Sequence, residues 1–233
     1  MMKTIGKAKD SAKNQRGNAM IYILVALALF GFLTLALTRQ NLRSDNQNLS
    51  RERIDLYSNE LIEYVGSAQQ VIDMMIMSGS DANDLDFMLP TNVGFNTAPH
   101  IHKVFHPSGG GLNYLPEPSS NILEPISADA GWQYQDQINV EWTPLDNLGN
   151  PTNDVLIIAH EIKRPICEYI NEQITGSTTI PVLTGTIATH FVPGGGNNDF
   201  TTTECAACEG YSSLCVANNA QTAYSYYTIL EAR

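Results

Sequence analysis

Residues 17–39, GNAMIYILVALALFGFLTLALTR, decide how the chain is organised, because a basic leader, one glycine and a long apolar run follow one another there. Residues 19–37 carry no charge. A helix of that length, at about 1.5 Å per residue, would cover the ~30 Å hydrocarbon core of a bilayer. Residues 1–16 carry five basic residues and one acidic residue, and positive flanks stay in the cytoplasm. The sequence therefore predicts a single-pass inner-membrane protein with a cytoplasmic N-terminus and a periplasmic or extracellular head.

Two other N-termini fit parts of this pattern. A cleaved secretory signal has an apolar region of about 7–15 residues and a small-x-small cleavage site, whereas here the run is longer and Thr38-Arg39-Gln40 follows it. An uncleaved anchor that holds a periplasmic binding domain needs only the apolar run and the charged leader. That second arrangement is the main alternative for function.

The order Arg16-Gly17-Asn18, then Ala19 to Tyr22, then a long apolar helix resembles the N-terminus of type IV pilins and type II secretion pseudopilins. The resemblance implies that a prepilin peptidase cuts between Gly17 and Asn18 and that the new N-terminus is methylated. It also implies that Gly31 lies in the middle of a helix that packs within a filament.

Tyr22 departs from this family pattern. Most members carry a glutamate at this position, the fifth of the mature chain, where the carboxylate pairs with the amine of a neighbouring subunit. A phenol cannot supply that charge, and a charge in an apolar medium needs a partner. The resemblance therefore implies a minor or tip-like subunit rather than a major pilin.

The resemblance and the apolar spacing together predict an α+β, pilin-like fold. Its long N-terminal helix would have a transmembrane half and an amphipathic half, and would pack on an antiparallel β-sheet head. Proline is absent from residues 39–77, and apolar residues recur there at three- and four-residue spacing up to Ser78-Gly79-Ser80. The expected divisions are a basic leader at 1–17, a transmembrane helix at 18–38, its amphipathic continuation at 39–78 and a globular head at 79–233.

Within the head, residues 80–131 are rich in proline, glycine and asparagine, which favours turns. Pro165 at the first turn and isoleucines four residues apart predict a helix over Arg164–Ile174. Aromatic, β-branched or continuous apolar runs predict the strands. These are Lys103–Phe105, Leu112–Leu115, Trp132–Trp142, Asp154–Ala159, Ile180–Leu183, Thr186–Val192 and Thr222–Leu230.

The four cysteines are Cys167, Cys205, Cys208 and Cys215. An even number in an exported domain predicts two disulfides, with three pairings open. A four-thiolate zinc site is the alternative, although the chain has one Cys-x2-Cys pair and not the usual two. The pilin resemblance implies that a disulfide clamps the C-terminal loop, residues 201–216.

The sequence predicts no enzyme. Phosphate loops, nucleophile elbows and zinc-protease helices are absent from it. His100, His102 and His106 cluster in PHIHKVFHP. On a strand, the first two would share a face and could bind a metal with a third ligand. The simpler interpretation makes them loop residues that face solvent.

Residues 17–233 carry eight basic and twenty-three acidic residues, a net charge of −15, which disfavours nucleic-acid binding. The sequence predicts no cofactor and no bound metal. Its expected partners are other pilin-like subunits, prepilin peptidase and inner-membrane lipid. The predicted function is a structural subunit of a type IV pilus or type II secretion-type filament.

Overall fold

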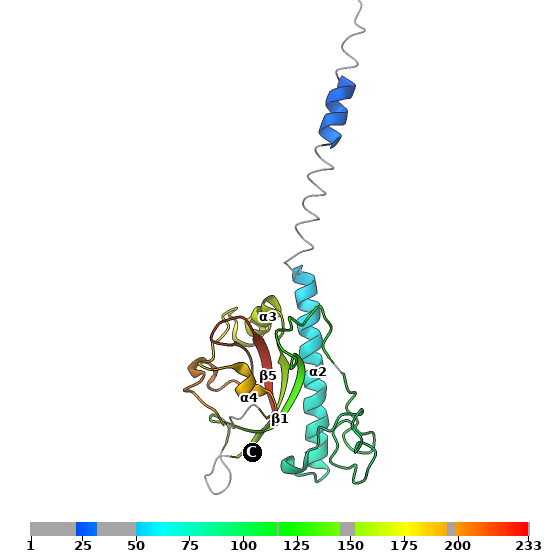
Figure 1. The fold of residues 1–233 in the computed structure, drawn as a ribbon, viewed down its shortest axis with the longest axis vertical. Coiled ribbons are helices and arrows are strands. Elements are labelled where there is room, and N and C mark those ends of the chain that lie inside the picture. The colour runs from blue at the N-terminus through cyan, green and yellow to red at the C-terminus, as the bar shows by residue number, and fades with distance from the viewer. Residues whose placement is uncertain (1–21, 32–49, 116, 145–151, 195–198, 233) are drawn as a thin grey trace, which may run out of the picture. The chain divides into compact units, whose positions relative to one another are not determined.

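The computed structural model describes residues 22–31, 50–115, 117–144, 152–194 and 199–232. The chain divides into two compact units, Met1–Ser50 and Arg51–Arg233 (Figure 1). In the first unit, residues 22–31 form an exposed helix. The second unit contains one long helix, a sheet and several short helices, and it is a mixed α+β fold.

The predicted transmembrane helix at 18–38 and the long N-terminal helix are contradicted by the structure. Within the described residues, no helix is both long enough and apolar enough to cross a membrane. The inner-membrane localisation was drawn from the predicted transmembrane helix and is contradicted with it. Residues 18–21 and 32–49, on which part of the prediction falls, lie outside the described residues.

Of the predicted amphipathic continuation at 39–78, the structure describes residues 50–78, in which α2 spans Arg51–Met77; residues 39–49 lie outside the described residues. Ser50, which is not helical, is of a type favoured before a helix.

One stripe of α2 packs against the sheet. The buried apolar residues follow three- and four-residue spacing, as expected for one face of a helix; they are Leu61, Tyr64, Val65, Ala68, Ile72 and Met75. The helix ends as predicted, with Gly79 at φ 98°. The Ser80 N–H donates to the Met75 carbonyl at 3.0 Å, which closes the last turn.

The sheet has five strands in the order β3-β1-β2-β5-β4. Their bounds are β1 Gly131–Val140, β2 Asp154–His160, β3 Asp199–Phe200, β4 Ser213–Ala217 and β5 Tyr224–Glu231. All pairs are antiparallel except β1 with β3. Strands β1, β2 and β5 lie close to their predicted positions, and the antiparallel sheet of the head is therefore present.

Helices cover both faces of this sheet. Figure 1 shows α2 and α4, Ile187–Phe191, on opposite sides of β5. α3, Arg164–Thr175, contacts α2, β4 and β5. All seven residues of β2 are buried, which explains its continuous apolar sequence. Leu156 and Ile158 of β2 join Phe191 of α4 in a core cluster that includes no residue of α2.

Several predicted strands are wrong. Thr186–Val192 forms α4, because Ile187, His190 and Phe191 are buried at helical spacing. Ile180–Leu183 makes one isolated bridge, Val182 to Ala217, and no strand. Lys103–Phe105 and Leu112–Leu115 also form no strand, since the local pairing there is a single bridge between Asp86 and Lys103. The remaining short elements are the 3-10 turns Ala82–Asp84 and Ala206–Cys208.

Candidate interaction site

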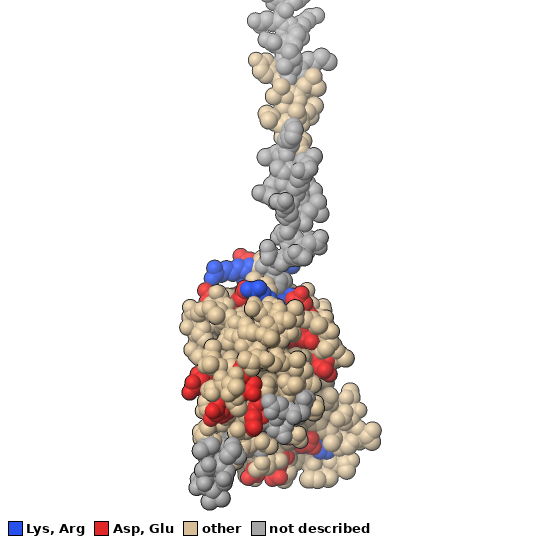
Figure 2. Space-filling view, turned by 60° about the vertical axis from the view of Figure 1, so that its left-hand side comes forward, with Lys and Arg blue, Asp and Glu red and all other residues tan. Residues whose placement is uncertain are grey.

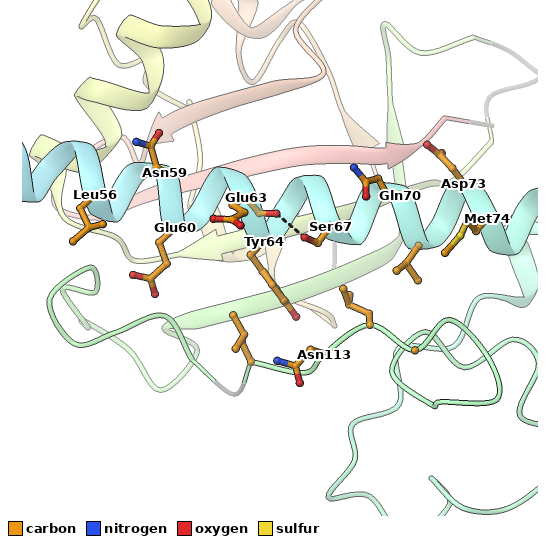
Figure 3. Close-up of a pocket in the computed structure, with 14 residues that line it drawn as sticks. Leu56, Asn59, Glu60, Glu63, Tyr64, Ser67, Gln70, Asp73, Met74 and Asn113 are labelled. Atoms are coloured by element: carbon orange, nitrogen blue, oxygen red, sulfur yellow. Dashed lines mark hydrogen bonds between the residues drawn. The ribbon is translucent and has the colours of Figure 1, made fainter.

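An open groove of about 1000 Å³ runs along the flank of α2 that does not face the sheet. Its helix wall is built by side chains three and four residues apart, so they form one stripe. They include Leu56, Glu60, Glu63, Ser67 and Met74. Figure 3 shows this row along α2, with Tyr64 pointing toward the segment that carries Asn113.

The opposite wall is the segment Gly111–Leu115, which includes Leu112 and Leu115. Gly110 allows this segment to lie against the helix. A Cβ at Gly110 would come within 2.6 Å of the Val104 carbonyl oxygen and 2.7 Å of both Met75 Sδ and Val71 Cγ1. No side chain fits at that separation, so the groove depends on glycine at this position.

The groove is apolar at its base and acidic at its rim. Glu60, Glu63 and Asp73 are exposed and line it. No described residue that lines it is basic or histidine. Asp73 accepts a hydrogen bond from Gln69 at 3.1 Å, whereas Glu60 and Glu63 have no hydrogen bond or ion pair through their carboxylates within the described residues. The rim therefore favours a positively charged partner.

Tyr64 closes the base of the groove and offers no acid or base chemistry. Its hydroxyl lies 3.1 Å from the Tyr134 hydroxyl, and its ring centroid is 4.7 Å from that of Trp132. Burial raises the pKa of Tyr64, and the hydrogen bond with Tyr134 only partly opposes that rise. The Tyr64 phenol therefore stays neutral and is not an activated nucleophile.

Ser225, His160 and Glu161 resemble a catalytic triad in residue type, and the sequence did not point to them. Ser225 Oγ lies 2.7 Å from His160 Nδ1, and His160 Nε2 lies 3.7 Å from Glu161 Oε1. The three residues are only 0%, 2% and 4% exposed. A catalytic serine must meet its substrate; this cluster instead ties β2 to β5.

Glu161 has a structural task in that cluster. Its carboxylate accepts hydrogen bonds from the backbone N–H groups of Ile126 and Ser127, the latter at 2.8 Å. Burial by itself would raise the pKa of Glu161, but these donors outweigh it and the net pKa is lowered. The charged glutamate thus holds the segment that leads into β1.

The histidine loop contains a buried lysine. Lys103 Nζ donates to the carbonyls of Gly94, Phe95 and Thr97 at 2.6, 2.8 and 2.6 Å. His100 and His106 stack with ring centroids 4.0 Å apart, and His102 Nδ1 lies 3.2 Å from Ser80 Oγ. The described residues contain no group of three or more potential ligands placed to hold a metal. His100 and His102 lie in no strand, so the face that they would share on a strand is not formed.

The cysteines form two disulfides, which confirms that prediction and settles the pairing. Cys167 on α3 bonds to Cys215 on β4, with a Cα–Cα distance of 5.4 Å. Cys205 bonds to Cys208 across a 3-10 turn, with a Cα–Cα distance of 5.3 Å. The first bridge fixes α3 to the sheet. The second lies within residues 201–216, where the family resemblance implied a clamp.

The residues predicted for processing and filament packing are not brought into this site. Gly17 and Asn18 lie outside the described residues. Tyr22 and Gly31 are the first and last described residues of a helical stretch and are exposed. A Cβ at Gly31 would meet nothing within 4 Å. Their roles in a filament remain predictions.

The groove was missed by sequence reasoning. Glu60 and Glu63 lie on an exposed flank of α2, but the second wall comes from residues 111–115, far along the chain. No family model, curated protein or solved structure matches this chain.

Proposed function

We propose that the protein is a structural subunit, minor or tip-like, of a type IV pilus or type II secretion-type filament. The observation that carries the proposal is the double use of α2. One stripe of the helix holds the head together, and a second flank forms a groove of about 1000 Å³ with an apolar base and unpaired carboxylates. Such a surface is suited to assembly with another protein.

Two further observations support this function. The leader ends in Arg16-Gly17-Asn18 ahead of an apolar run, the order that prepilin peptidase substrates have. The head carries two disulfides, which persist in oxidising compartments. Tyr22, where most such subunits have glutamate, favours a scarce position such as the tip.

A second candidate is a binding domain that is never processed and whose groove takes a peptide. The size of the groove favours it, since ligand sites commonly enclose about 300–1000 Å³. The two functions differ at the N-terminus, because a binding domain has no need of a cut after Gly17.

The test is the mass of the N-terminus of the full chain, expressed with and without an active prepilin peptidase. We expect a mature chain that begins at Asn18 and carries a methyl group. Gly17→Leu should abolish the cut, whereas Gly31→Ala, which adds a methyl group in open space, should be cut normally. A chain that still begins at Met1 in the presence of the peptidase would exclude the filament function.

Position within the filament is tested by immunogold labelling of sheared filaments. Labels from the wild-type protein should be few and terminal. Tyr22→Glu should raise labelling along the shaft, because it restores a carboxylate for the amine of a neighbour. Abundant wild-type labelling along the shaft would contradict the minor or tip-like rank.

A further inference from the structure

The exposed cations of the globular unit gather at one end. Its described Lys and Arg residues are Arg51, Arg53, Lys103, Lys163 and Arg164, and Lys103 is buried. The other four lie at the N-termini of α2 and α3. Figure 2 shows blue side chains, with red ones beside them, at the end where α2 begins, and scattered red side chains elsewhere on that face.

Helix stability does not explain this placement. The N-terminus of a helix carries partial positive charge, so cations there are unfavourable. Arg164 is compensated by Glu168, with Nε 2.7 Å from Oε1, and Lys163 Nζ donates to the Asn121 carbonyl at 2.8 Å. Arg51 and Arg53 have no hydrogen bond or ion pair in the described part of the chain. Cations at a helix N-terminus that have no acidic partner to offset their cost commonly indicate a functional surface.

Unpaired charges of both signs therefore lie on one helix. Arg53 and Glu60 are seven residues apart, about 10 Å along the axis, which is too far for direct pairing within α2. Asp55, which could have paired with Arg51 one turn away, instead accepts hydrogen bonds from Tyr169 at 2.6 Å and Asn59 at 3.1 Å. The side chains of Arg51, Arg53, Glu60 and Glu63 are therefore left available to another molecule.

We propose that the groove along α2 receives the Arg51 and Arg53 turn of α2 from a second copy of the chain. The inference rests on the proposed filament function and deepens it, because it names the contact between copies. Arginine suits the site, since its planar fork can bind a glutamate through two parallel hydrogen bonds. Leu56, at the mouth of the groove, is 63% exposed and adds an apolar contact between the two copies.

The charge of the remaining surface selects this contact. Residues 51–233 contain six basic and twenty-two acidic residues. Two copies that approach through other faces bring like charges together, which disfavours those encounters. Among the described residues, the end that carries the arginine turn also carries the other exposed cations, so it is the part of a second copy that can meet an acidic groove with opposite charge.

The test uses two charge-reversed variants of the full-length protein, Glu60→Arg/Glu63→Arg and Arg51→Glu/Arg53→Glu. Association is measured by sedimentation velocity at low ionic strength. Each variant alone should associate at least tenfold more weakly than the wild type. An equimolar mixture should regain association, because each altered surface then meets its complement. Failure of the mixture to associate would overturn the proposal.

The matched control is Glu124→Arg/Glu209→Arg, which makes the same change in net charge at exposed positions outside the groove. It should associate as the wild type does. An equal loss in this control would show that net charge, and not the groove, governs association, and would overturn the proposal.

A photo-reactive amino acid in place of Ser67 locates the occupant of the groove. Cross-linked peptides should contain residues 51–53 of a second copy. Cross-links to a different protein, or to another segment of this chain, would overturn the proposal. If the mixed variants regain association but the protein is not cut after Gly17, the contact between copies stands and the filament function is overturned. If the protein is cut but the mixed variants do not associate, only the contact between copies is overturned.

Discussion

Asn171 on α3 exchanges two hydrogen bonds with the backbone of Cys215 on β4. Its Oδ1 accepts from the Cys215 N–H, and its Nδ2 donates to the Cys215 carbonyl, each at 2.8 Å. The side chain thus provides the donor and acceptor that a neighbouring strand would supply along the edge of β4. Cys167, four residues earlier on the same helix, bonds covalently to the same residue.

Asn171→Leu should destabilise the fold, because both backbone groups of Cys215 lose their partners in a fully buried place. Leaving a buried polar group unsatisfied costs about 1–3 kcal/mol, so we expect the free energy of unfolding to fall by at least that amount. Urea denaturation measures it. Gln173→Ala, an exposed change on the same helix, is the control and should cost little. Equal losses in the two variants would contradict the prediction.

The two disulfides should differ in their contribution to stability. Cys167–Cys215 has a sequence separation of 48, and Cys205–Cys208 one of 3. Loop-closure entropy then gives about 4 kcal/mol for the first bridge and about 1.6 kcal/mol for the second. We expect Cys167→Ala/Cys215→Ala to lower the free energy of unfolding more than Cys205→Ala/Cys208→Ala. All four residues are buried, so cavity costs are similar, and equal losses in urea would exclude the chain-entropy explanation.

Lys103 should control the order of residues 94–97. Its ammonium group satisfies three carbonyls, and hydrogen bonds to a charged group contribute about 1.5–3 kcal/mol each. Lys103→Met should therefore speed amide exchange and proteolysis within this loop. Lys103→Arg should not rescue it, because a planar guanidinium cannot point toward three carbonyls as an ammonium group does. Lys163→Met, at the surface, is the control, and rescue by arginine would contradict this account.

Acid should first reduce stability through the buried histidines. Burial lowers the pKa of His160 and of His190, so each folded pKa lies below the unfolded value of about 6.5. The unfolded state therefore binds more protons as the pH falls through about 6.5, and stability decreases from there toward the folded pKa. His160→Gln should reduce the slope of unfolding free energy against pH by up to one proton, about 1.4 kcal/mol per pH unit. If His160→Gln leaves the slope of unfolding free energy against pH unchanged below about pH 6.5, His160 is not a source of the acid sensitivity.

The second acid stage belongs to Glu161. Because its net pKa is lowered in the fold, the stability it confers is present above its unfolded value of about 4.3 and is lost as the pH falls through the folded pKa. Glu161→Gln removes the charge that holds Ile126 and Ser127. It should flatten the curve below about pH 4.3 and leave the histidine stage in place, which separates the two groups in one titration.

The residues of some helices and strands were sufficient to predict them from the sequence. Pro165 and the isoleucine spacing placed α3 within one residue of its observed end, and a continuous apolar run identified β2 as a strand covered on both faces. α4 was mistaken for a strand, because its β-branched residues favour strands by propensity. In the structure this segment is a helix that contacts β1 and β5. Contacts between distant segments cannot be read from the order of residues in the sequence.

The candidate site was less predictable than the fold of the head. The helix wall of the groove follows from residue spacing on α2. The other wall depends on the close approach of Gly110 to Val104 and Met75, which only glycine permits. The disulfide pairing likewise depends on α3 lying beside β4. The expected long membrane helix is not found among the described residues; an uncharged run specifies polarity and length alone.

The strand order has a consequence for how the protein is made. β5 lies between β2 and β4, yet it is the last of the strands to leave the ribosome. Until residues 224–231 have been synthesised, β2 has a partner only in β1 and presents an unpaired apolar edge. Such an edge is a template for mispairing with other nascent chains. The head therefore completes its sheet only once residues 224–231 are available to pair, and a holding chaperone should increase the yield of correctly folded protein.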